Sequence, residues 1–303
     1  MISRYTHKKL TWIDLENPTR EEIAALAEEY SLHPVAANEL FSPSERAKID
    51  LYENSLYMIL HFPIRNKETG HIEEVEVDFM LLGDTLITTH YQLVEPLHDF
   101  AKLFEIGSYL NQGVYSTHAG FLFFFAIREL YNHTLFLLEG VNHDIRDIEK
   151  HIFAGDEAGM VSRISKINRQ LIDVRQSMRY HKETLRSFSA AAVKIYGADF
   201  AYYVSAIEGS YERIIQMAEE NRQTIYDLRE TNDSLLSAKS TATIRRLTAL
   251  SVIMMPLSFI SWVFAMDSKY LNLDDPKMLL TVFGAMAGIF LISAVYFRMK
   301  KWL

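Results

Sequence analysis

A carboxylate, Asp267, directly follows the first of the two most apolar segments of the chain. It stands in the stretch FAMDSKY, after residues 247–266 and before residues 278–297, and neither segment contains Asp, Glu, Lys or Arg. A helix of about 20 residues spans the roughly 30 Å hydrocarbon core of a bilayer. We therefore expect two transmembrane helices, with the Asp267 carboxylate at the membrane edge.

A second group of residues recurs at spacings of three and four, which places its members on one face of a helix. This group, called the hydroxyl face below, consists of Glu230, Asp233, Ser237, Thr241, Ile244, Thr248, Ser251, Met255 and Ser258. Membrane Ser and Thr residues commonly bond to backbone carbonyls or allow helices to approach closely. In an assembly that turned this face inward, they would instead line a narrow hydrated path with apolar constrictions at Ile244 and Met255.

Three further residues have a spacing that suits a metal ion. His143, Asp147 and His151 fall at i, i+4 and i+8 of one helix face, where they could ligate Zn²⁺ or Ni²⁺. They lie near the turn of a charged helical hairpin, so a solvated polar face is the alternative interpretation.

Several classes of protein are disfavoured by what the sequence contains. It has no Gly-rich phosphate loop, no HExxH and no nucleophile elbow, so neither an enzyme nor a bound cofactor is predicted. The net charge of −8 and the lack of basic patches with interleaved aromatics argue against a nucleic-acid partner. With no cysteine, any metal ligand must be an oxygen or an imidazole.

Basic residues flank the two apolar segments, and the loop between them is acidic. The basic residues are Arg245, Arg246, Arg298, Lys300 and Lys301, and the loop acids are Asp267, Asp274 and Asp275. Basic flanks remain on the cytoplasmic side, so we expect a multi-pass protein of the cytoplasmic membrane with both termini inside. The N-terminus has no apolar signal-peptide region, which predicts that the first 240 residues stay in the cytoplasm.

The chain before the membrane divides into an α/β part and a helical part. Strands are predicted at 56–62, 74–80 and 85–90, and Thr19 with Glu22 predicts a helix capping box. Residues 113–190 indicate a long helical hairpin that turns at AGDEAG, and a third helix runs from Gly197 towards the membrane. Gly284 and Gly288 form a GxxxG in the second apolar segment, which permits close helix contact.

A helix as long as the third one needs packing partners, because propensity alone does not stabilise it. An apolar seam along it could join several copies of the chain or pack only within one chain. Its residues are Tyr203, Ile207, Tyr211, Ile214, Ala218, Ile225 and Leu228.

Six segments, in order, resemble the CorA family of divalent cation transporters over essentially the whole length. They are TWIDLENPTREEIAALAEEYSLHP, SERAKIDLYENSLYMIL, VDFMLLGDTLITTHY, IEKHIF, RRLT…MMPLSFI and FRMKKWL. The resemblance implies an α+β membrane protein that forms a homopentamer, with a cytoplasmic αβα funnel and a stalk helix that becomes a pore-lining first transmembrane helix. The corresponding ranges are 1–196 for the funnel with its hairpin, 197–246 for the stalk, 247–266 and 278–297 for the transmembrane helices, 267–277 for the loop and 298–303 for a basic tail.

The resemblance also implies roles for residues of the hydroxyl face. Thr241 matches a pore Asn at the cytoplasmic side, Ser258 replaces a pore Thr and Glu230 matches a stalk acid. Ile244 and Leu247 match apolar gate residues. The pattern of spacing and the family's pore-lining positions therefore coincide.

The chain departs from the family at the predicted pore entrance. The family's first transmembrane helix ends in Gly-Met-Asn, or in Gly-Ile-Asn in some ZntB-type zinc transporters, whereas Ala265, Met266 and Asp267 stand here. A ring of Asp267 carboxylates would contact the hydrated cation in place of the amide ring. Neighbouring carboxylates would raise one another's pKa, and bound metal would reverse that effect.

The sequence therefore predicts a pentameric channel or transporter for divalent cations such as Mg²⁺, Co²⁺, Ni²⁺ or Zn²⁺. The alternative is a membrane sensor or assembly protein that does not conduct or that has another selectivity. Loss of Gly-Met-Asn favours that alternative, as does Ala206, which stands where the resemblance implies an acid that binds regulatory metal. Glu208 is nearby in sequence but faces elsewhere on a helix.

Overall fold

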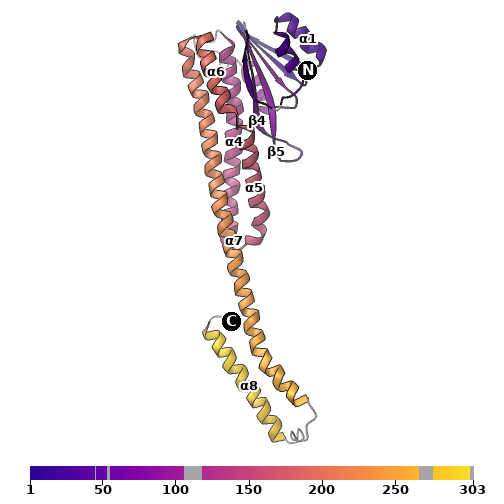
Figure 1. The fold of residues 1–303 in the computed structure, drawn as a ribbon, viewed down its shortest axis with the longest axis vertical. Coiled ribbons are helices and arrows are strands. Elements are labelled where there is room, and N and C mark those ends of the chain that lie inside the picture. The colour runs from indigo at the N-terminus through magenta and orange to yellow at the C-terminus, as the bar shows by residue number, and fades with distance from the viewer. Residues whose placement is uncertain (45, 53–54, 106–117, 266–275, 301–303) are drawn as a thin grey trace. The chain divides into compact units, whose positions relative to one another are not determined.

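The computed structural model describes residues 1–303 except 45, 53–54, 106–117, 266–275 and 301–303 (Figure 1). The chain forms two compact units. The first comprises residues 1–155 and 159–228, and the second comprises residues 156–158 and 229–303.

A six-stranded mixed sheet lies at the centre of the first unit. Its strands are β1 (Ile2–His7), β2 (Leu10–Glu16), β3 (Lys48–Leu51), β4 (Ser55–Arg65), β5 (Ile72–Leu82) and β6 (Thr85–His90). The order is β1-β2-β6-β5-β4-β3, in which only the pair β2 and β6 is parallel. The three predicted strands correspond to β4, β5 and β6.

Helices cover both faces of this sheet. Helices α1 (Arg20–Glu29) and α2 (Pro34–Glu39) pack on the face that carries Tyr57, Ile59 and Met80. The helices on the other face are α3 (Glu95–Glu105), α4 (Ala119–Phe153) and α6 (His181–Tyr196), and Phe123 of α4 meets Phe79 at 5.1 Å between ring centroids. Strand β4 is buried along ten of its residues because both faces are covered. This is the predicted αβα arrangement.

Local signals at the start of α1 act as predicted. The Thr19 hydroxyl accepts a hydrogen bond from the Glu22 backbone N–H, and the Glu22 carboxylate accepts one from the Thr19 N–H. This capping box satisfies two of the helix's otherwise unpaired donors.

The helical hairpin consists of α4 and α5 (Glu157–Ser177), with the turn at the predicted place. The second arm of the predicted hairpin is not one continuous helix, because a turn at residues 178–180 separates α5 from α6. The turn carries His181 into the core, where its side chain bonds to β4 and α4. That tertiary contact explains why the helix is interrupted at residues 178–180, where the sequence has neither Gly nor Pro.

A short 3₁₀ turn (Ala198–Phe200) leads into α7 (Ala201–Ala265), a single helix with Pro256 inside it. Six of the seven seam residues of α7 are buried within the chain itself, for example Ile207 and Ile214 at 2% and 0% exposure. The interpretation of this seam as an interface between copies is therefore wrong, and the alternative of packing within one chain is correct.

The last helix is α8 (Pro276–Met299), and it includes residues 278–297. Among the described residues, three helical segments are long and apolar enough to cross a membrane: Ala119–Phe153, Ala198–Val263 and Leu280–Met299. The apolar window of the first is 61% buried inside the folded chain, compared with 11% and 6% for the others. Helix α4 thus owes its apolarity to the core of the first unit.

Candidate functional site

All nine residues of the hydroxyl face are exposed on α7. A residue advances about 100° around a helix, so these residues fall within an arc of about 100°. Leu247, the further gate residue implied by the family resemblance, lies about 20° outside this arc and is 59% exposed. The structure brings the predicted path residues together on one strip of surface.

The opposite side of α7 packs against α8. Ala249 and Ile253 are 0% and 3% exposed, and they form a cluster with Phe297 of α8. On the helical wheel these two residues lie about 150° from the centre of the hydroxyl face. The hydroxyl face consequently points away from α8.

Three of the five hydroxyl groups on this face are already used as donors. Oγ1 of Thr248 donates to the Ile244 carbonyl at 2.9 Å, and Oγ of Ser251 and of Ser258 donate to the Leu247 and Met254 carbonyls at 3.0 Å each. A hydroxyl has one hydrogen but two acceptor lone pairs, which remain directed outwards. A hydrated cation presents water hydrogens at its surface, so an acceptor lining matches it.

Large apolar side chains interrupt the hydroxyls. Ile244 is 61% exposed and Met255 is 76% exposed, at the two predicted constrictions. Apolar rings in a narrow path oppose ion passage because water leaves them readily. The face therefore combines the two surface types that a gated path for hydrated ions requires.

The predicted entrance lies mainly outside the described residues. Ala265 is the last residue of α7. Met266, Asp267 and the loop acids Asp274 and Asp275 are outside the described ranges, so their roles remain predictions.

The His143, Asp147 and His151 group is not a metal site in this structure. The Asp147 carboxylate pairs with the Arg163 guanidinium at 2.7 Å, which holds the pKa of Asp147 below its usual range. Nδ1 of His151 donates to the Asp147 carbonyl at 2.9 Å. Within the described ranges no cluster of three or more His, Asp or Glu side chains could hold a metal ion, so the solvated-face interpretation stands.

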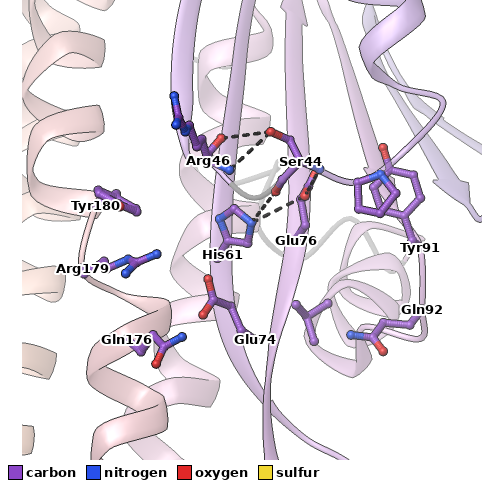
Figure 2. Close-up of a pocket in the computed structure, with 12 residues that line it drawn as sticks. Ser44, Arg46, His61, Glu74, Glu76, Tyr91, Gln92, Gln176, Arg179 and Tyr180 are labelled. Atoms are coloured by element: carbon purple, nitrogen blue, oxygen red, sulfur yellow. Dashed lines mark hydrogen bonds and ion pairs between the residues drawn. The ribbon is translucent and has the colours of Figure 1, made fainter.

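A polar cavity of about 760 Å³ in the first unit was not predicted from the sequence. Figure 2 shows Gln176, Arg179 and Tyr180 on one side of it and strand residues His61, Glu74 and Glu76 on the other. Alternation in EVEVD places Glu74 and Glu76 on one face of β5, which is the signal that could have revealed this group.

The buried polar groups at this cavity are joined to one another by hydrogen bonds and an ion pair. Nε2 of His61 donates to the Ser44 carbonyl at 2.9 Å and lies 3.5 Å from Oε2 of Glu76 (Figure 2). Burial lowers the pKa of His61, but Glu76 and the Ser44 carbonyl outweigh it and the net shift is upwards. Burial and the neighbouring Glu76 raise the pKa of Asp78 well above its usual range, and Tyr57 donates to this carboxyl at 2.8 Å. This network ties the loop at Ser44 to the sheet.

Comparison with known proteins gives similar chains along almost the whole length. A "Cobalt/magnesium transport protein CorA" of Thermotoga maritima is 24% identical over 97% of this chain and 83% of that protein. A "Putative metal ion transporter YfjQ" of Bacillus subtilis is 24% identical over 96% of this chain and 89% of that protein. The structure of the CorA magnesium transporter from Methanocaldococcus jannaschii has a TM-score of 0.83 at 17% identity, covering 99% of this chain and 93% of that one.

The similarity extends to the order of the elements. The mixed sheet, the long helix and the apolar C-terminal helices of this chain match that solved full-length structure, which confirms the predicted fold. The family model described as "CorA-like Mg2+ transporter protein" matches residues 7–301. This chain belongs to that family of membrane transporters.

Proposed function

We propose that the chain is one subunit of a homo-oligomer that moves divalent metal cations across the cytoplasmic membrane, with the hydroxyl face lining the path. The observation that carries the proposal is the position of this face: it is exposed in the single chain and lies opposite Ala249 and Ile253, which pack against α8. Neighbouring copies would cover this strip around a shared axis, which would direct the acceptor lone pairs of its hydroxyls into a common path. The resemblance implies five copies.

The proposed cargo is Mg²⁺, with Co²⁺, Ni²⁺ and Zn²⁺ as further candidates. Mg²⁺ dehydrates reluctantly and keeps several waters when bound. The outward acceptor lone pairs of Thr248, Ser251 and Ser258 suit an ion that arrives with its water shell. Relatives are named as transport proteins for cobalt and magnesium or for magnesium, which supports the same class of ion.

The proposed driving force is the electrochemical gradient. A membrane potential of 100 mV is worth roughly 4.6 kcal/mol for a divalent cation moving inwards. In the proposed topology α7 and α8 each cross the bilayer once and both termini lie in the cytoplasm. The Asp267 ring would then capture ions on the outer side, with Asp274 and Asp275 adding to the negative potential.

Uptake by proteoliposomes tests this function. Native protein should take up Mg²⁺ faster than protein-free vesicles, and Asp267→Ala should reduce uptake at low ion concentration more than at saturating concentration. Asp267→Asn restores the family's amide and should retain uptake, with weaker dependence on pH. Uptake by the native protein that is unaffected by Asp267→Ala would refute the capture role.

A second function, a non-conducting membrane sensor or assembly protein, is favoured by two positions. Ala206 is exposed on α7 where the resemblance implies a regulatory acid, and Asp267 replaces the family's Asn. In that case the native protein would show no uptake of Mg²⁺, Co²⁺, Ni²⁺ or Zn²⁺, although native mass spectrometry would still detect an oligomer.

A further inference from the structure

Trp262 continues the line of the hydroxyl face towards the end of α7. It follows Ser258 by four residues and Met255 by seven, which places it about 20° from Met255 on the helical wheel. Its side chain is 76% exposed, as is that of Met255. Trp262 therefore lies on the side of α7 that faces away from α8.

The chemistry of the face changes at this point. From Ser237 to Ser258 its residues are hydroxyls and the apolar side chains of Ile244 and Met255, whereas Trp262, the next residue of this series four positions after Ser258, is an indole. An indole is rigid, with two side-chain torsions, and its ring face carries negative potential. Cations and the hydrogens of bound water are both attracted to such a face.

We propose that Trp262 is a size filter for the hydrated cation, formed when indoles from neighbouring subunits surround the path between the Asp267 entrance and Ser258. The proposal rests on the proposed transport function. A ring of indoles narrows the path more than any Ser or Thr ring on the same face. It would pass an ion with a compact water shell and contact that shell through its ring faces.

The competing explanation is an interfacial anchor, because Trp is enriched where transmembrane helices meet the headgroup layer. An anchor faces lipid, whereas a filter faces water in the path. Lipid would therefore contact the indole of an anchor, whereas water and dissolved ions would contact the indole of a filter.

Fluorescence quenching in proteoliposomes separates these two roles without measuring transport. The emission of Trp262 is obtained as the difference between native protein and Trp262→Phe protein, since Trp12 and Trp302 are common to both. A filter predicts that aqueous Ni²⁺ quenches this difference signal and that brominated phospholipids leave it largely unchanged. Quenching by brominated lipid and not by Ni²⁺ would overturn the proposal.

Flux measurements then test the filter itself. Trp262→Ala should raise the initial rate of Mg²⁺ uptake at least about threefold and increase the relative uptake of Ca²⁺, with Trp262→Phe intermediate. The control is Phe283→Ala on α8, which truncates an aromatic side chain of 63% exposure away from the hydroxyl face and should leave both quantities unchanged. Unchanged rate and selectivity in Trp262→Ala would overturn the proposal.

Failure of the filter is distinguishable from failure of the transport function. If native protein takes up no ion but Ni²⁺ quenches Trp262, transport fails while the water-facing position of the indole is supported. If native protein takes up Mg²⁺ while lipid alone quenches Trp262, transport stands and the filter is refuted.

Discussion

Nε2 of His181 donates a hydrogen bond of 2.7 Å to the backbone carbonyl of His61. The Tyr131 hydroxyl donates to Nδ1 of the same ring at 2.8 Å. A carbonyl only accepts, so Nε2 carries the hydrogen and Nδ1 is the acceptor of a neutral imidazole. Complete burial lowers the pKa of His181 to about 3, which keeps it neutral in the folded protein.

This neutral, buried His181 predicts that the first unit loses stability in acid. The unfolded chain binds a proton to this residue at about pH 6.5, whereas the folded chain does so only near pH 3. The free energy of unfolding should therefore fall by up to about 1.4 kcal/mol per pH unit as the pH drops from about 6.5 towards 3. Thermal unfolding of the detergent-solubilised protein at pH 7.0 and 4.5 measures this.

His181→Leu is the matched variant for that test. It leaves the His61 carbonyl and the Tyr131 hydroxyl without their partner, which should reduce stability at pH 7 by about 1–3 kcal/mol. It also removes the titrating group, so its deficit relative to native protein should shrink at pH 4.5. A deficit that is equal at both pH values would contradict this account.

His90 predicts the opposite pH dependence. Its Nδ1 donates to the Gln92 carbonyl at 2.7 Å and its Nε2 lies 3.3 Å from Oδ2 of Asp14. Burial lowers the pKa of His90, but the bond to Asp14 outweighs it and the pKa is raised. The pair therefore stabilises the fold fully below about pH 6.5, and this contribution is lost as the pH rises through the raised pKa of His90.

Asp14→Asn should accordingly destabilise the protein more at pH 6 than at pH 9, by about 1.5–3 kcal/mol at the lower pH. The control is Glu29→Gln, which makes the same carboxylate-to-amide change in the exposed pair with Arg4. That pair is bidentate but exposed, so the control should cost at most about 1 kcal/mol, and the same amount at pH 6 and pH 9. Equal losses for Asp14→Asn at pH 6 and pH 9 would show that the imidazolium is not involved.

The sequence predicted elements whose signals are local and missed those set by distant contacts. Strands β4, β5 and β6 have apolar or β-rich runs, but β1 is a partly exposed edge strand with no clear alternation. The hairpin turn after β1 places Lys8 at φ 56°, a conformation that favours glycine, so the residue type did not announce the turn.

In the candidate site, too, local signals were predicted and distant contacts were not. Helical periodicity was enough to group Ser251 and Met255 on one face, because spacing along a helix is a local property. That this face points away from α8 depends on Ala249 and Ile253 meeting Phe297, which is far along the chain. The sequence left two partners open for the seam of α7 for the related reason that periodicity identifies a buried face without identifying what buries it.

The Ala249 contact predicts that α7 and α8 tolerate no added volume between them. Ala249 is fully buried beside Ile253 and Phe297, so Ala249→Leu should overpack the contact at a cost of about 1–3 kcal/mol. The control is Ala242→Leu, the same change at an exposed position of α7. Thermal unfolding should show a lower midpoint for the first variant alone, and equal midpoints would refute the packing.

The hydroxyl face predicts that transport depends on which side of α7 a hydroxyl occupies. Ser251 and Ser261 each donate to the carbonyl four residues earlier, at 3.0 Å. On the helical wheel, however, Ser261 lies about 110° from the centre of the hydroxyl face. Valine at either position removes the acceptor lone pairs and makes the same increase in side-chain volume. Ser251→Val should therefore lower the Mg²⁺ uptake rate several-fold, because the water shell loses an acceptor and the path becomes more apolar. Ser261→Val should leave uptake near the native rate, and similar effects of the two changes would show that the face does not contact the ion.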